Sequence, residues 1–353
     1  MTKLLKYTLL TAIQIGLASS ATFAGNEDRV GQAGANELLI NPFARSSGMA
    51  GSNIASIKGI EAMFLNVAGT AFTKKTEFVF AHTQWLGSAD ININSFGFTQ
   101  SVGKDKTGTI GLGIMSINYG DINRTTFDQP DGGLGTYSPS SVNIGLSYAK
   151  EFSNSIYGGV VVKAISQSIS DITANGIAFD AGIQYVTGKK ENLRFGISLR
   201  NIGPRMKFAG DGLSFRGSVP ATGATLTVEQ RAEAFEMPAT LYIGAAYNVD
   251  INESQKLNFA ANFQSNSFSR DNIQLGAEYQ FFKMFMLRAG YSFELTSNTS
   301  TNPNIRASAF TGPTAGFTFE LINKNKSSFA VDYSYRITNP FGGVHSIGVR
   351  INL

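Results

Sequence analysis

The chain has 353 residues, of which 42% are hydrophobic, 11% aromatic and only 15% charged. This charged fraction lies well below the roughly 25% of ordinary soluble domains, while the apolar content is too high for a disordered chain. The absence of cysteine excludes disulfides, thiolate metal sites and cysteine nucleophiles. The net charge of +4 comes from scattered basic residues, which form no clustered patch for nucleic-acid binding.

The first 24 residues have the pattern of a secretory signal peptide. Lys3 and Lys6 precede a short apolar run at 7–18, and small residues around Ala24 form a cleavage site. The apolar run is shorter than the roughly 20 residues that a membrane-spanning helix needs, so we expect cleavage before Gly25 and not an anchor. No later stretch is as apolar. The exported chain is therefore predicted to be either soluble or a closed β-barrel.

From residue 77 to the end, apolar and polar residues alternate with a period of two. In 141–149, for example, Val142, Ile144 and Leu146 share one face, and Asn143 and Ser147 lie on the other. Such alternation predicts β-strands, and about ten residues is the length at which a tilted strand crosses a bilayer. The predicted strands, about 14 in number as an even-stranded barrel requires, are 77–86, 90–102, 107–119, 140–152, 156–169, 176–187, 193–203, 237–249, 255–265, 271–282, 285–295, 312–321, 327–336 and 344–353.

The links between these strands fall into two sets. Every second link is short, as at 153–155 and 283–284, whereas the other set contains the three long links 120–139, 204–236 and 296–311. Short turns at one rim and long loops at the other are typical of outer-membrane barrels, and a soluble sandwich has no need for such sorting. The sequence therefore predicts an all-β, antiparallel transmembrane barrel in the outer membrane of a Gram-negative bacterium. Both termini are expected in the periplasm and the long loops outside the cell.

The two faces of the strands differ in chemistry. Outward rows are expected to carry Leu, Ile, Val, Phe, Tyr and Ala against lipid, and inward rows Gly, Ser, Asn and Gln. The charged residues predicted to face inward are Arg194, Arg200, Glu278, Arg288, Glu294, Asp332, Arg336 and Arg350. Of these, Glu278 and Arg288 are expected to pair across neighbouring strands. Aromatic residues near strand ends fit an interfacial girdle, and they are Trp85, Tyr119, Tyr185 and Tyr279.

Residues 25–76 do not alternate and precede the barrel domain at 77–353. Their small residues let a backbone approach a barrel wall closely, where a side chain would collide. Apolar residues such as Met49, Ile54 and Phe64 have no use in a free tail. We therefore expect residues 30–70 to fold into the lumen or its periplasmic mouth as a plug. A disordered periplasmic tail is the alternative.

Two blocks of this segment form recognisable motifs, and their residues are Arg45, Gly48, Met49, Gly51, Asn66, Ala68 and Gly69. They resemble the patterns Arg-x-x-Gly-Met-x-Gly and Asn-Pro-Ala-Gly of the PorV/PorQ family of outer-membrane proteins, distant relatives of the FadL long-chain fatty-acid transporters. Val67 stands here in the place of the proline. The resemblance implies a FadL-like barrel with an N-terminal plug segment. It also implies an accessory role in the type IX secretion system, where family members bind the carboxy-terminal signal domain of exported cargo or anchor that cargo.

Two long loops carry more apolar residues than freely solvated loops favour. The candidate partner-binding residues in 120–139 and 204–236 are Phe127, Tyr137, Met206, Phe208, Phe215 and Phe235. Such loops either fold over the barrel mouth as a lid or bind a partner, and the sequence favours neither.

The sequence contains no recognisable catalytic constellation. His82 and His345, the only histidines, are expected at opposite ends of the barrel, which leaves no paired-histidine metal site. No nucleophile elbow or phosphate loop occurs, and the acidic stretch 128–133 lacks the spacing of a calcium loop, so it is interpreted as a turn. We therefore expect no catalytic residues, no metal, no cofactor and no enzymatic activity.

The sequence leaves three functions to compare. In the first, the barrel is a type IX secretion platform whose extracellular loops bind cargo domains or neighbouring translocon or attachment components, with outer-membrane lipid around it. In the second, it is a FadL-like transporter of a hydrophobic small molecule, which the polar inward rows disfavour. The third is a diffusion porin, but about 14 strands with a plug leave little open lumen.

Overall fold

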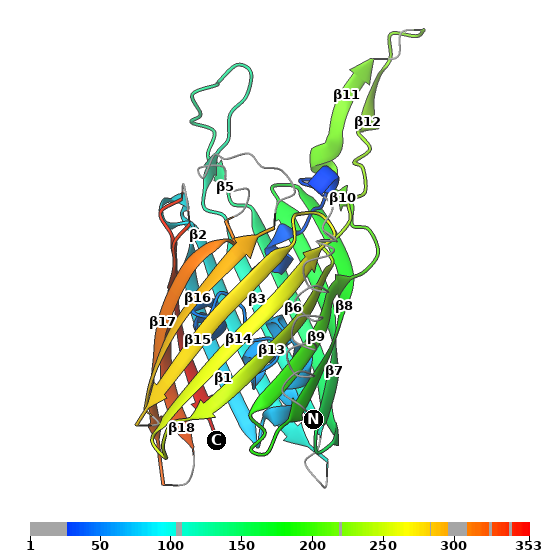
Figure 1. Cartoon of the computed structure of the whole chain (residues 1–353). Helices are drawn as coiled ribbons and strands as arrows, with labels where there is room; N and C mark the ends of the chain where they lie inside the picture. The colour runs from blue at the N-terminus through cyan, green and yellow to red at the C-terminus, as the bar shows by residue number, and fades with distance from the viewer. Residues whose placement is uncertain are drawn as a thin grey trace.

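The structure is a computed structural model that describes residues 27–103, 108–218, 221–282, 284–295, 309–324, 327–338 and 341–353. The predicted signal peptide, its cleavage site and most of the predicted loop 296–311 lie outside the described residues. Within the described ranges, no helix is long and apolar enough to cross a membrane. The chain forms a tall cylinder of tilted strands with two extensions above one rim (Figure 1).

The barrel strands occur where the alternating pattern predicts them. They are β1 (Thr76–Trp85), β2 (Ile91–Val102), β3 (Gly108–Asn118), β6 (Ser140–Ser153), β7 (Ile156–Ile169), β8 (Ile172–Thr187), β9 (Leu193–Ile202), β13 (Thr240–Asp250), β14 (Gln255–Asn266), β15 (Asn272–Phe281), β16 (Phe285–Glu294), β17 (Gly312–Ile322), β18 (Ser328–Arg336) and β19 (Val344–Asn352). All pairings between these strands are antiparallel, and β1 pairs with β19, which closes the ring. The predicted 14-stranded barrel is therefore confirmed in the described part of the chain.

Each strand exposes one row of side chains and buries the other. In β8, Ile177 and Ile183 point outward and are 50% and 54% exposed, whereas Asp180 and Gln184 are buried. Lipid offers no hydrogen-bond partner to a polar group, so apolar residues predominate on the outward row and most polar residues lie on the inward row. The predicted pair across neighbouring strands is also confirmed, since Arg288 Nε lies 2.5 Å from Glu278 Oε2.

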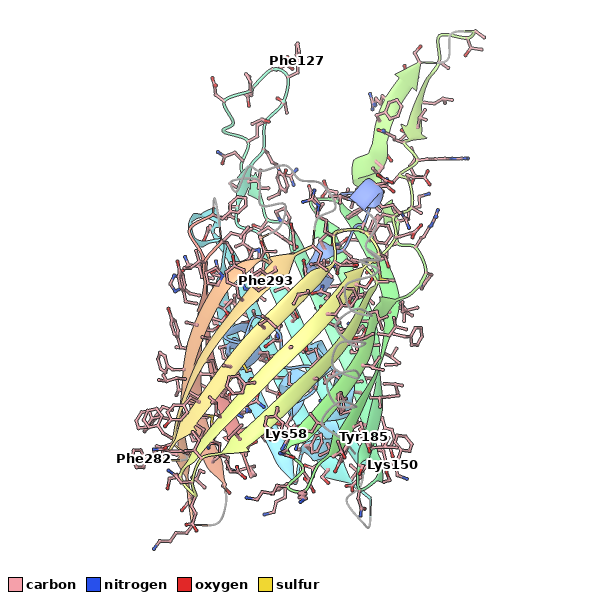
Figure 2. The ribbon with its side chains drawn as sticks, viewed as in Figure 1. Lys58, Phe127, Lys150, Tyr185, Phe282 and Phe293 are labelled. Carbon is pink, nitrogen blue, oxygen red and sulfur yellow. The ribbon has the colours of Figure 1, made fainter. Side chains whose placement is uncertain are left out.

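The aromatic girdle is only partly as predicted. Trp85 belongs to the inward row of β1, where it is buried and its ring centroid lies 5.5 Å from that of Phe310. The prediction was wrong for Trp85. Successive residues of a strand point to opposite faces, and the alternation in β1 places Trp85 on the inward face. Tyr185 does face outward at the end of β8, near the lower rim in Figure 2.

The two rims of the barrel differ as the link lengths predict. One rim, here called the short-turn rim, carries tight turns such as the one between β6 and β7. The opposite rim, called the long-loop rim, carries β4 (Ile122–Asn123) with β5 (Thr136–Tyr137), and also β10 (Phe208–Ala209), η6 (Asp211–Leu213), β11 (Ser214–Ser218) and β12 (Thr225–Glu229). Both extensions rise from this rim in Figure 1.

The residues before β1 run through the inside of the barrel. They form η1 (Glu27–Arg29), η2 (Asn36–Leu39), α2 (Ala44–Ser47), η3 (Ile60–Phe64) and η4 (Val67–Phe72). Nearly all of residues 35–70 are buried, and we call this stretch the luminal segment. Its inside position follows from its hydrogen bonds to inward-facing wall residues, for example from Ser198 Oγ to the Leu65 carbonyl at 2.7 Å.

The two described ends of the chain lie at opposite rims. Gly34 donates its amide to the Glu236 carbonyl at 3.0 Å, and Arg29 pairs with the Glu236 carboxylate at 3.1 Å, both on the long-loop rim. Hydrogen bonds from Arg29 and Arg205 lower the pKa of Glu236 below its ordinary value. Leu353, by contrast, bonds to Thr76 at the short-turn rim. The expectation that both ends lie on one side is corrected for the described residues, because the luminal segment crosses the barrel from rim to rim.

Candidate functional site

The luminal segment touches the barrel wall where the wall residues are glycine. A Cβ atom placed on Gly290 of β16 would lie 2.4 Å from the Met49 carbonyl carbon, which is far inside contact distance. Gly196 faces the Ala55 backbone and Gly276 faces the Met49 carbonyl oxygen in the same way. The absence of side chains at these positions allows the backbone of the segment to lie directly on the sheet.

The first family-like block, Arg45 to Gly51, fastens the segment to one side of the wall. Thr314 donates to the Gly48 carbonyl at 3.1 Å, and Asn262 donates to the Gly51 carbonyl at 2.6 Å. Gly51 has a φ of +73°, which a residue with a Cβ rarely adopts. Arg45 lies 3.8 Å from Glu278. These contacts explain why this block contains Arg45 and the glycines at 48 and 51.

The second block, Asn66 to Gly69, fastens the opposite side. Asn66 is fully buried and donates its amide to the carbonyls of Ile54 at 3.1 Å and Ile183 of β8 at 3.0 Å. Its carbonyl oxygen accepts from Ala68 and so caps η4. A Cβ on Gly69 would lie 2.3 Å from the Ile57 carbonyl oxygen. Residues of both blocks therefore hold the segment on the wall or shape the segment itself.

The lumen has an apolar half and a polar half. Around β1 to β3, inward residues such as Val79, Ile93 and Met115 pack on Phe43 and Phe64, whose rings meet edge to face at 5.2 Å. Around β14 to β19, most of the buried wall residues are amides, hydroxyls and members of ion pairs. Between the segment and the long-loop rim lies a cavity of only about 60 Å³. That volume holds a few waters at most.

Three charged side chains form a buried cluster that the sequence reasoning missed in part. Asp180 of β8 lies 2.5 Å from Lys163 Nζ of β7 and 3.7 Å from Arg200 Nε of β9. Asp180 also accepts a hydrogen bond from the backbone N–H of Asn201 at 2.8 Å. Arg200 was predicted to face inward, but Lys163 and Asp180 were not singled out. Only the register between the three strands brings them together.

Above the long-loop rim, β11 and β12 form a hairpin with two chemically different faces. Phe215 pairs with Val228 and Gly217 with Leu226, so Phe215, Leu226 and Val228 share one face. These three are 53%, 53% and 41% exposed. The hairpin pairs only with itself among the described residues, which leaves the outer edges of both strands open.

The six predicted partner-binding residues occupy two different environments. Met206, Phe208 and Phe235 pack together against Leu38 and Ile165 at the long-loop rim, and Met206 is fully buried there. In contrast, Phe127 is completely exposed at the tip of its loop (Figure 2) and Phe215 lies on the hairpin. Tyr137 is half-buried beneath Arg124. Of the aromatic candidates, Phe127 and Phe215 are thus the ones most open to a partner.

The two histidines lie on neighbouring strands and not at opposite ends of the barrel as expected. Closure pairs β1 with β19 so that His82 faces Ile347 and Gln84 faces His345. The expectation was wrong because the ends of a chain meet in a closed barrel. His82 bonds to Asn94 and His345 to Tyr333, each at 2.9 Å. Among the described residues, no group of three or more potential metal-binding side chains occurs.

Comparison with known proteins gives one family and several structural neighbours. The family model described as "Type IX secretion system membrane protein PorP/SprF" matches residues 63–351, most of the chain. The search of curated proteins found no match.

Among solved structures, the fold is similar to three barrels. The Pseudomonas putida toluene transporter TodX has a TM-score of 0.55 at 13% identity, covering 88% of this chain and 97% of that one. The CymD monoaromatic hydrocarbon channel has 0.54 at 14%, covering 89% and 97%. The Ralstonia pickettii toluene transporter TbuX has 0.52 at 14%, covering 88% and 97%. At these identities the similarity shows the fold alone, and the expected antiparallel β-barrel fold is confirmed.

Proposed function

Because the chain belongs to the PorP/SprF family of type IX secretion system membrane proteins, we propose that it is an outer-membrane platform whose long-loop rim binds another protein of that system. The partner is the carboxy-terminal signal domain of secreted cargo or a neighbouring translocon or attachment component. The family match is to the type IX secretion system, the same system that the sequence resemblance implies. The finer PorV/PorQ name stays a prediction.

The observation that carries the proposal is the amphipathic hairpin β11–β12. It presents an apolar face to solvent and leaves two strand edges open, both of which a soluble monomeric protein normally avoids. A β-rich partner can add a strand to such an edge, with main-chain hydrogen bonds supplying affinity and apolar side chains supplying specificity. Phe127 on the second extension offers a further exposed aromatic anchor.

Because the luminal segment occupies the inside of the barrel, a platform function is favoured over transport through the barrel. We propose that the luminal segment is a plug, since its apolar side chains are buried against the wall and glycines bring the two backbones into contact. A FadL-like transporter of hydrophobic molecules is the second candidate. The polar half of the lumen and the small cavity above the segment argue against a continuous apolar path.

The orientation follows from the loop lengths. We propose that the long-loop rim faces the outside of the cell and that the C-terminus faces the periplasm, as in outer-membrane barrels with short periplasmic turns. In this orientation the hairpin lies where exported cargo emerges. The described N-terminal residues, which contact Glu236, then lie at the outer mouth.

Removing the hairpin tests the proposal. Leu213 and Gln230 are joined by a hydrogen bond of 2.8 Å, so residues 214–229 can be replaced by Asn-Gly without stretching the chain. Met206 and Phe235 stay in place. We expect co-purification of the partner in mild detergent, and surface attachment of cargo, to fall by about tenfold or more, because the anchoring contacts are lost.

A matched pair of variants separates the two faces of the hairpin. Phe215→Ser with Leu226→Ser and Val228→Ser should reproduce the loss, whereas Ser214→Ala with Arg216→Ala and Thr227→Ala, on the other face, should keep most binding. Secretion and surface attachment that stay at wild-type levels in the hairpin-less protein, with the barrel folded, would reject the proposed role.

A further inference from the structure

Beneath the luminal segment, at the short-turn rim, lies a second cavity of about 320 Å³. It is formed by the segment, the turn between β8 and β9, and the wall strands β9, β13, β14 and β15. Its lining includes five basic and three acidic side chains, namely Arg45, Lys58, Lys190, Arg194 and Lys256, and Glu191, Asp250 and Glu278. Lys58 marks this end of the barrel in Figure 2.

Two of the acids are already neutralised. Asp250 lies 3.3 Å from Lys256, and Glu278 lies 2.5 Å from Arg288. Arg45 reaches Glu278 only at 3.8 Å, on the same oxygen that Arg288 holds. Four cations of the cavity remain: Arg45, Lys58, Lys190 and Arg194. They outnumber the one remaining carboxylate, Glu191, which makes no ion pair with the described residues.

The strongest sign of a binding site is Arg194. Its side chain is only 5% exposed, and its Nη1 has no hydrogen-bond partner among the described residues. A buried charged donor without a partner is costly, so it marks a place where a ligand supplies the missing acceptor. The guanidinium carbon lies 5.2 Å from the centre of the Phe72 ring, and Lys58 Nζ lies 5.1 Å from the same ring. The aromatic ring thus holds two cations close together.

We propose that this cavity binds a small oxyanion, a sulfate, phosphate or carboxylate group, between Arg194, Lys58 and Arg45. A planar guanidinium fork and a mobile ammonium together suit an anion with two or more acceptor oxygens. The inference does not depend on the identity of the partner at the long-loop rim or on transport. Its failure leaves the proposed platform function untouched.

The protonation of Lys58 couples the site to pH. Burial by the surrounding wall, followed by the charges of Arg194 and Arg45, lowers the pKa of Lys58 to about 8, although part of the residue is exposed at this mouth. The other charges that act on it are Glu191, which opposes this shift, and Lys74, which adds to it. A lysine with a lowered pKa is also a better nucleophile near neutral pH, which provides a local probe.

In the test, the full-length mature protein in detergent is treated with an acetylating reagent in the presence of sulfate. Mass spectrometry then measures the rate at which Lys58 is acetylated. Chloride at equal ionic strength is the reference, and Lys150, an exposed lysine at the same rim, is the internal control. We expect sulfate to slow acetylation of Lys58 in a saturable manner and to leave Lys150 unchanged. Arg194→Gln should raise the half-protecting sulfate concentration about tenfold, and Arg194→Lys much less.

The pH dependence gives an independent readout, because sulfate keeps its charge over the range. The half-protecting concentration should rise several-fold between pH 7 and pH 9 as Lys58 loses its proton. Heat-modifiable gel mobility verifies that each variant is folded. Equal protection of Lys58 and Lys150, or no protection by sulfate in the folded wild-type protein, would overturn the proposal.

Discussion

Deleting residues 27–72 should turn a closed barrel into a conducting pore. In planar bilayers the wild-type protein is expected to show no steady channels, because the segment fills the lumen and leaves a cavity of only about 60 Å³ above it. The deletion removes this filling and exposes the polar half of the lumen to water. Stable conductance steps at least about tenfold above the wild-type background should appear, since a water-filled barrel of this size passes ions.

A point variant gives the same test without a deletion. Gly290→Leu places a side chain where the Met49 backbone now lies, so it should displace the segment and produce intermittent channels. Ala289→Leu, at the preceding position of the same strand, places the same leucine side chain on the lipid-facing row and should remain closed. A deletion variant that folds and stays non-conducting would show that something other than the segment closes the barrel.

Replacing Asp180 by alanine should destabilise the barrel severely. The carboxylate holds Lys163 at 2.5 Å and Arg200 at 3.7 Å, and all three side chains are buried. Without it, two cations remain uncompensated in a poorly solvated site, which typically costs about 3–5 kcal/mol of unfolding free energy. Urea unfolding in lipid vesicles, followed by fluorescence of the single tryptophan, measures the change.

The matched control is an exposed ion pair of the same kind. Asp250 lies 3.3 Å from Lys256 at the short-turn rim, where both side chains are solvated. Asp250→Ala should cost no more than about 1 kcal/mol, as for other surface pairs. Similar losses for the two variants would mean that the buried cluster contributes little beyond an ordinary surface pair.

The period-two pattern was sufficient to predict the barrel strands, since each element repeats its alternation over about ten residues. The ion pair between Glu278 and Arg288 was also predictable, because both residues belong to the inward rows of adjacent strands that a short link joins. Link lengths likewise distinguished the two rims. These features are all local in sequence.

The features that the sequence could not give depend on contacts between distant segments. His82 and His345 become neighbours only through closure, and Lys163, Asp180 and Arg200 meet only through the register of three strands. The burial of Met206 follows from the path of the N-terminal residues along the long-loop rim. No composition or spacing signal marked these contacts. The positions of Lys58 and Arg194 near the Phe72 ring at the short-turn rim likewise became apparent only from the three-dimensional structure.

Cysteine labelling on intact cells tests the central claim most directly, because the natural sequence has no cysteine and each introduced thiol is unique. Thr227→Cys places a thiol on the hairpin, and Lys324→Cys places one on a turn at the opposite rim; both positions are exposed. A membrane-impermeant maleimide should label Cys at 227 in intact cells and Cys at 324 only after the outer membrane is disrupted. Labelling of position 324 in intact cells, with position 227 protected, would contradict an outer-membrane barrel that presents its hairpin to the outside.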